Sequence, residues 1–144
     1  MEWSAVEPEV AGGWGERTVA DTTTHPPVIK SLHYQFDDWS GDELVTSFPC
    51  FLITARLARH LPEGLTGFKL APVEVTKSDV FRELNPRKRL PKFHWLQVVG
   101  TAGRDDFGMS QDHLLVVSAQ ALAALRSGRL ENCEVSRWPS GPTG

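Results

Sequence analysis

The chain has 144 residues, of which 40% are hydrophobic and 23% charged, and its formal net charge is −3. This length suffices for one domain with a sizeable core, and the apolar and charged fractions are ordinary for a soluble globular protein. The longest nearly apolar run, Leu114 to Leu125, is too short for a membrane-spanning helix. The cysteines are Cys50 and Cys133 alone, which excludes a disulfide-rich scaffold and favours small apolar core residues.

The start of the chain and its charge distribution bear on location and partners. The first residues, Met-Glu, lack the basic and then apolar stretches of a secretory signal, so we expect a cytoplasmic protein. Residues 1–46 hold nine acids against two bases, whereas residues 47–144 hold nine acids against thirteen bases. Such a chain can present an acidic face and a basic face.

The N-terminal part of the chain predicts two strands. The first is expected around residues 5–11, before a glycine-rich break. Residues 28–36 then alternate in polarity, which predicts a half-buried strand. Tyr34 and Phe36 fall on its buried face, and His33 falls on its polar face.

The next segment has the spacing of a helix start. Ser40 and Glu43 form a capping box, and Trp39 and Leu44 have the spacing of a hydrophobic staple. Pro49 disfavours helical geometry at the residue before it. We therefore expect a short helix that begins at Ser40 and ends near residues 46–47.

The second half of the chain contains an internal repeat. Residues 50–70 read CFLITARLARHLPEGLTGFKL, and residues 114–135 read LLVVSAQALAALRSGRLENCEV. In both, an apolar run ends at a hydroxyl residue, Thr54 or Ser118, and a small amphipathic segment and a glycine follow. A strand, a helix capped by the hydroxyl and a second strand are the structure that this pattern favours.

The remaining pattern completes the predicted fold. A capped helix starts at Thr76 or Ser78, and residues 100–112 form a loop. In all, about seven strands and four short helices are expected. Helices this short favour an α+β fold with a mainly antiparallel, twisted sheet and the two repeat helices on one face. We expect one domain over residues 1–138 and a disordered tail over 139–144. The strands expected in the second half are 50–53, 67–75, 93–99, 114–117 and 130–137.

Catalytic and metal-binding signatures do not stand out. The five histidines lack two-histidine ligand spacing with a nearby acid, so we expect no metal and no cofactor. Residues 108–112, GMSQD, contain half of a nucleophile elbow but lack its closing glycine and its strand-to-helix context. We therefore predict no catalytic residues. An enzyme remains an alternative, in which His33 or His94 would meet Asp105 or Asp106 in a deep pocket.

An acidic segment around a tryptophan is the best candidate for partner binding. Tryptophan often anchors protein interfaces, and charge complementarity speeds association. The alternative is that this tryptophan only staples the predicted helix to the core. A second acidic pair lies in the loop over 100–112, which is either a solvated loop or a protein-binding loop. The predicted partner-binding residues are Asp37, Asp38, Trp39, Asp42, Glu43, Asp105 and Asp106.

A basic loop, Arg87 to Lys92, lies beside aromatic residues. Nucleic-acid binding requires several such charges to neutralise phosphates. Because the chain as a whole is acidic, we favour a solvated loop.

The strings CFLIT, GLTGFKLAPVEVTKSDVF, LPKFHWLQVVG and HLLVVSAQALAAL resemble bacterial immunity proteins of polymorphic toxin loci and related uncharacterised families. The likeness covers roughly residues 45–137. It implies a cytoplasmic protein that neutralises a cognate toxin, such as a nuclease, by occluding its active site. The acidic N-terminal third would then face a basic toxin surface. A structural or adaptor module within a larger assembly, which could form a homodimer through an exposed sheet edge, is the alternative from another class.

Overall fold

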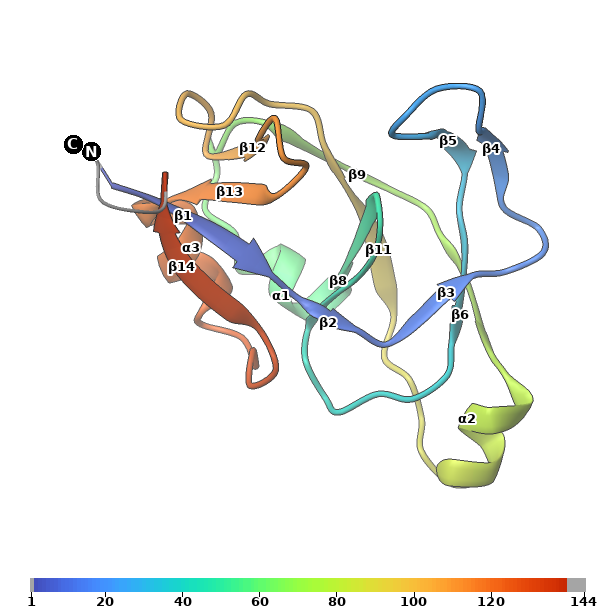
Figure 1. The fold of residues 1–144 in the computed structure, drawn as a ribbon. Helices are drawn as coiled ribbons and strands as arrows, with labels where there is room; N and C mark the ends of the chain where they lie inside the picture. Colours follow the sequence, from blue (N-terminus) through green and yellow to red (C-terminus); the bar gives the residue numbers. More distant parts are fainter. Residues whose placement is uncertain (1, 140–144) are drawn as a thin grey trace.

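The computed structural model describes residues 2–139 and confirms the predicted α+β class. Short strands dominate, and three short helices occur among the described residues. Figure 1 shows the path of the chain. The strands are β1 (Trp3–Glu7), β2 (Glu9–Val10), β3 (Gly12–Trp14), β4 (Val19–Asp21), β5 (Val28–Ser31), β6 (His33–Phe36), β7 (Leu44–Ser47), β8 (Cys50–Thr54), β9 (Phe68–Ala71), β10 (Glu74–Lys77), β11 (Phe93–Val98), β12 (Phe107–Met109), β13 (Leu115–Ser118) and β14 (Glu134–Trp138). The helices are α1 (Ala55–Arg59), α2 (Asp79–Leu84) and α3 (Ala119–Leu125).

Two related sheets form the main body of the domain. One has the strand order β12-β13-β1-β14, and the other has the order β7-β8-β11-β9, extended at β7 by the short parallel strand β2. In each, a hairpin leads into a helix, and the strand after the helix forms the opposite edge. The internal repeat therefore extends beyond the strand–helix–strand unit that the sequence shows.

The two units exchange one strand each. Unit A consists of β1, β7, β8, α1 and β9, and unit B consists of β11, β12, β13, α3 and β14. However, β1 pairs with β13 and β14 of unit B, and β11 pairs with β8 and β9 of unit A. The registers match: Trp3 lies opposite Ser118, and Phe93 lies opposite Thr54. The main body thus has an interleaved, approximately twofold arrangement.

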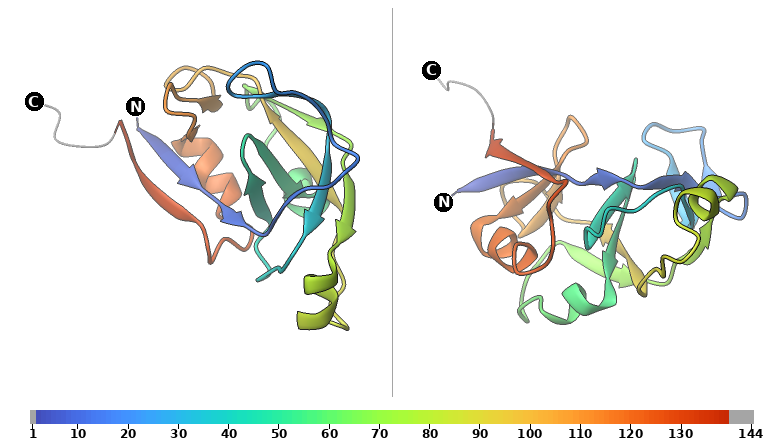
Figure 2. Two further views of the ribbon diagram at one scale, coloured as in Figure 1. Left: turned by 45° about the vertical axis from the view of Figure 1, so that its right-hand side comes forward. Right: turned by 90° about the horizontal axis from the view of Figure 1, so that it is seen from below.

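The repeat helices begin where the sequence predicted. The Thr54 hydroxyl accepts a hydrogen bond from the Leu57 amide, and the Ser118 hydroxyl accepts one from the Ala121 amide, both at 3.1 Å. Leu57 and Ala121 belong to one hydrophobic core, which fills the space between the two sheets. Figure 2 (right) shows α1 and α3 on the same side of the molecule.

Two insertions form an accessory layer beside this body. The first, residues 11–41, carries β3 to β6, and the second, residues 72–92, carries β10 and α2. They meet in a three-stranded sheet with the order β10-β6-β3, next to the β4–β5 hairpin. A second core, which includes Tyr34, Phe36 and Phe81, joins this layer to β8 and β11. In Figure 1 the accessory layer lies on the right.

Several expected elements differ from those observed. The helix predicted from Ser40 is wrong: residues 44–47 form β7, which pairs with β8 on one side and β2 on the other. Leu44 and Val45 are both fully buried, and consecutive buried residues suit a strand covered on both faces. The strand predicted over 28–36 is divided at Leu32, and the one over 67–75 is divided at Pro72 into strands of different sheets.

Of three further predictions, one needs adjustment, one is confirmed and one falls mostly on residues outside the described range. The loop predicted over 100–112 contains β12, the outer strand of a hairpin with β13. The helix start at Ser78 is confirmed, because its hydroxyl accepts the Phe81 amide at 3.1 Å. Of the predicted disordered tail over 139–144, residues 140–144 lie outside the described residues.

Candidate functional site

Asp42 and Glu43, predicted to face a partner, are buried instead. Their relative exposures are 0% and 7%. The Asp42 carboxylate accepts the amides of Glu131 at 3.0 Å and Asn132 at 2.7 Å. These contacts fix the turn before β14, so Asp42 has a structural role. The predicted placement of Asp42 and Glu43 on an exposed acidic surface is wrong, because both are buried.

Glu43 has an equivalent in the second unit, Asp106. The Glu43 carboxylate accepts a hydrogen bond from the Thr54 hydroxyl at 2.9 Å, and the backbone carbonyl oxygen of Glu43 accepts one from the Thr54 amide at 2.9 Å. Likewise, the Asp106 carboxylate accepts a hydrogen bond from the Ser118 hydroxyl at 2.6 Å, and the backbone carbonyl oxygen of Asp106 accepts one from the Ser118 amide at 2.9 Å. Each acid therefore holds the helix cap of its own unit.

Each of these acids also reaches into the other unit. Glu43 accepts the Arg129 amide, which follows α3, at 2.8 Å, and Asp106 accepts the Thr66 amide, which follows α1, at 2.9 Å. Burial opposes ionisation of Glu43, but hydrogen bonds from Arg56, the Arg129 amide and Thr54 outweigh it and lower its pKa. The same balance, with Ser118 and Thr66 as donors, lowers the pKa of Asp106. Both carboxylates are thus ionised clamps between the units.

The other predicted binding residues do not form one surface. Asp37 and Asp38 are exposed, and Asp38 accepts the Asn85 side-chain amide, beyond α2, at 2.9 Å. Trp39 is half-buried, donates from Nε1 to the Asp42 carbonyl at 2.8 Å and packs edge-on against Phe93. The helix that Trp39 would staple in the alternative interpretation is absent, but its ring contacts the core.

Asp105 also has a local partner. Its carboxylate accepts the Thr101 amide at 2.7 Å. Asp105 and Asp106 therefore hold the loop between β11 and β12, whereas Asp38 is tied to the end of α2. The role of the exposed aspartates in partner binding stays a prediction.

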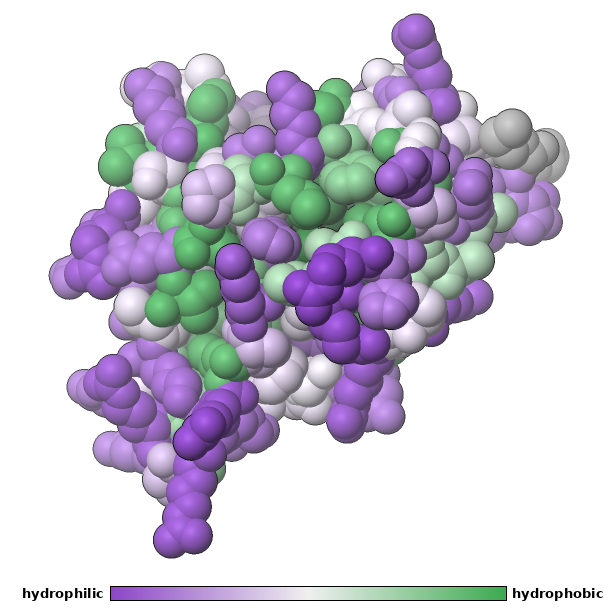
Figure 3. Space-filling model, turned by 180° about the vertical axis from the view of Figure 1, so that it is seen from behind, coloured by the Kyte–Doolittle hydropathy of each residue, from purple (hydrophilic) through white to green (hydrophobic). Residues whose placement is uncertain are grey.

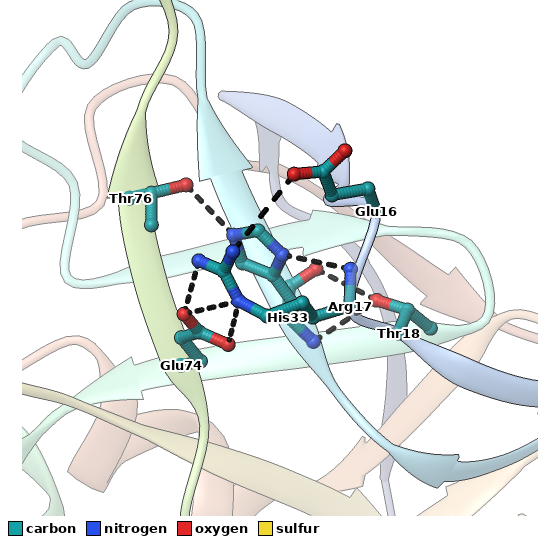
Figure 4. Close-up of polar contacts among 6 residues, drawn as sticks. All are labelled: Glu16, Arg17, Thr18, His33, Glu74 and Thr76. Carbon is teal, nitrogen blue, oxygen red and sulfur yellow. Dashed lines mark hydrogen bonds and ion pairs between the residues drawn. The ribbon is translucent and has the colours of Figure 1, made fainter.

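His33 lies in a polar cluster that the sequence did not reveal (Figure 4). It is 2% exposed, contrary to its expected place on a polar face. Its Nδ1 accepts the Arg17 amide at 3.2 Å, which leaves the proton on Nε2, and Nε2 donates to the Thr76 hydroxyl at 2.7 Å. Both ring nitrogens are engaged, so the imidazole holds β6 to β10 and to the loop after β3. Neither Asp105 nor Asp106 is among its partners.

The edge of this cluster carries an ion pair. The Arg17 guanidinium donates from Nε to both Glu74 oxygens, at 2.8 and 2.7 Å, and from Nη2 as well. The pair is largely exposed, so it orients β10 more than it stabilises the fold. Gly15 could have indicated the cluster in the sequence, because a Cβ there would lie 2.1 Å from the His33 ring.

An apolar depression lies where three hairpin tips meet. It has a volume of about 420 Å³ and is called here the apolar groove. Its walls come from the β4–β5, β7–β8 and β12–β13 connections and from β11. Figure 1 shows the β4–β5 and β12–β13 connections in the upper part of the molecule. Residues that define it are Pro27, Val28, Phe48, Trp95, Val99 and His113.

An aromatic cluster closes one end of the apolar groove. The rings of His25 and Phe48 stack with centroids 5.9 Å apart, and His113 meets both edge-on, 5.4 Å from His25 and 5.9 Å from Phe48. Phe48 and His113 lie at the tips of the equivalent hairpins of the two units. The interleaved arrangement therefore brings these two side chains together, which spacing along the sequence could not indicate.

Cys50 is buried and Cys133 is partly buried. Cys50 lies in the wall of the apolar groove, and burial raises its pKa to about 12. Burial, with nearby Asp42, raises the pKa of Cys133 to about 11.

Within residues 2–139, no three histidine, cysteine or acidic side chains gather as a metal ion would require. No helix in this range is long and apolar enough to cross a membrane.

No protein-family model matches this chain, and comparisons with curated proteins and with solved structures found no match.

Proposed function

We propose that this chain is a binding protein that holds an apolar segment of a partner protein in the apolar groove. One observation carries the proposal. Three exposed apolar side chains from three separate elements surround this groove: Val28 is 53% exposed, Phe48 is 46% exposed and Val99 is 60% exposed. Exposed apolar residues gathered in one patch are typical of protein interaction sites.

The groove suits a protein segment better than a small molecule, because Phe48 and Val99 line it and yet remain 46% and 60% exposed. His25 and Gln97 add polar groups at or near the same site, which suits the backbone of a bound loop. Phe48 is the expected anchor, since aromatic side chains contribute most to such interfaces.

We propose that this binding neutralises a toxin in the cytoplasm, as the resemblance implies. The contact differs from the one expected from the sequence. Burial of Asp42 and Glu43 removes half of the acidic segment from the surface, so the apolar groove replaces it as the main contact. Exposed Asp37 and Asp38 then contribute long-range attraction to a basic toxin.

The test is co-purification with the product of the neighbouring gene, with affinity measured by calorimetry. We expect Phe48→Ser and Val99→Ser to weaken the complex at least about tenfold. Val10→Ser is the matched control, because Val10 is 71% exposed and lies outside the groove. Equal loss in the control, or full affinity in Phe48→Ser, would contradict the proposal. Self-association through the groove, seen by light scattering, would favour the adaptor alternative.

A further inference from the structure

The strand β10 has an unpaired edge. Among the described residues it pairs with β6 alone, at the edge of the three-stranded accessory sheet. The amides of Glu74 and Ser78 donate to β6 and its flank, to the carbonyls of Leu32 at 3.1 Å and Phe36 at 2.9 Å. Because backbone groups alternate in direction along a strand, the N–H and C=O groups of Val75 and Lys77 point the other way. They face a groove.

That groove is lined by cations and apolar groups. It has a volume of about 600 Å³ and lies between β10 and residues 89–91; we call it the cationic groove. Lys77, Arg82 and Arg89 supply its charge, and its lining among the described residues includes no acid. Figure 3 shows the end of the molecule around α2, at the lower left, covered largely by hydrophilic side chains.

Neighbouring groups engage Lys77, the lysine on this strand. Lysines often protect edge strands by projecting charge along them. Here the Lys77 ammonium is held elsewhere: it donates to the Lys88 carbonyl at 2.7 Å and lies 5.3 Å from the centre of the Phe81 ring. Lys88 in turn donates to the Trp39 carbonyl at 2.6 Å. The basic loop predicted to be solvated is therefore partly anchored, and it forms the second wall of the groove.

We propose that the cationic groove binds an extended acidic peptide segment, which adds as a strand to the free edge of β10. Backbone groups of Val75 and Lys77 pair with the peptide, and Arg82 and Arg89 bind its carboxylates. This is a second binding surface, separate from the apolar groove. Nothing in it depends on the proposed toxin partner.

A peptide fits this site better than nucleic acid. The strand edge offers alternating donors and acceptors at the spacing of another strand, and Val75, Leu90 and Pro91 supply apolar contacts for alternate side chains. Single-stranded nucleic acid would instead need aromatic side chains on which bases stack, and the lining of the groove among the described residues includes none.

The test measures fluorescence anisotropy with labelled ten-residue probes. One probe alternates Glu and Val, a second alternates Lys and Val, and a third is a ten-nucleotide oligothymidine. Val75→Pro removes an outward N–H without breaking the ladder to β6, since proline is tolerated at such edge positions. Val75→Ala is its matched control, because it keeps the N–H. Arg89→Glu reverses a charge in the groove, and Arg104→Glu, on the exposed loop after β11, is the control for charge.

We expect the acidic peptide to bind at least about tenfold tighter than the basic one. Val75→Pro should bind it about fivefold more weakly than Val75→Ala, and Arg89→Glu about tenfold more weakly than Arg104→Glu. Equal binding of the two peptides, or equal affinity of the two Val75 variants, overturns the proposal. So does tighter binding of oligothymidine, or loss of peptide binding in Phe48→Ser, which would move the peptide to the apolar groove.

Discussion

Replacement of Glu43 by alanine should be among the most destabilising single changes in this protein. The Glu43 carboxylate accepts the Thr54 hydroxyl and the Arg129 amide, and Thr54 is itself 2% exposed. Each hydrogen bond to an ionised acceptor contributes about 1.5–3 kcal/mol, so loss of the bonds from the buried Thr54 hydroxyl and the partly buried Arg129 amide costs about 3–5 kcal/mol. A domain of this kind is stable by about 5–15 kcal/mol in total, so the variant loses a large share of its stability.

The measurement is urea unfolding at pH 7, followed by the fluorescence of the five tryptophans. Asp106→Ala tests the equivalent clamp, and it should cost about 2 kcal/mol because Asp106 is less buried. Glu63→Ala, on an exposed residue, is the control and should change the unfolding free energy by less than about 0.5 kcal/mol. A cost below about 1 kcal/mol for Glu43→Ala would refute the clamp.

The same clamp predicts a pH dependence. The pKa of Glu43 is lowered from its ordinary value of 4.5 in the folded protein. Its contribution is therefore fully present above pH 4.5 and is lost as the pH falls through the lower pKa of the folded state. Glu43→Gln, which does not titrate, should differ from the wild type most at pH 7 and progressively less in acid. A difference that stays constant down to pH 3 would contradict this assignment.

Three further experiments, two with substitutions and one with chemical labelling, test local features. Gly15→Ala should destabilise the fold by about 2 kcal/mol or more, since its Cβ would lie 2.1 Å from the His33 ring, whereas Gly13→Ala, with open space, should be tolerated in thermal unfolding. Ser118→Ala removes the cap of α3 and should cost about 1–2 kcal/mol by urea unfolding; an unchanged midpoint would argue against the cap. The Cys50 thiol, with its pKa raised to about 12, should react with a disulfide reagent at pH 8 only after urea unfolds the protein. Fast labelling of the native protein at Cys50 would show that it is accessible.

Local signals predicted the fold well where the partner of a residue lies a few positions away. Thr54, Ser78 and Ser118 cap helices through amides three residues ahead, which a hydroxyl before an amphipathic segment already indicates. Ser40 and Glu43 show the same spacing, but the Glu43 carboxylate binds Thr54 and Arg129, 11 and 86 residues away. The capping box failed there because tertiary contacts outcompeted a local one.

Burial of charge was the main obstacle to predicting the site. An acidic run in a sequence predicts a solvent-exposed segment, because burying a carboxylate costs free energy unless several donors form hydrogen bonds to it. For Asp42 the donors are the amides of Glu131 and Asn132, about ninety residues further along the chain. Every residue type except proline has a backbone amide, so the sequence does not indicate which distant amides bind a carboxylate, and this burial could not be predicted. The contact of Phe48 with His113 could not be predicted either, because these residues are far apart in the sequence.

The exchange of β1 and β11 between the units has a consequence for how the chain can be divided. Neither unit completes a sheet from its own strands, so an isolated half would leave a gap the width of one strand beside its hairpin. Two copies of one half could fill each other's gaps, as the two halves do here. We therefore expect separately expressed halves to complement each other, and neither half to fold as an isolated monomer.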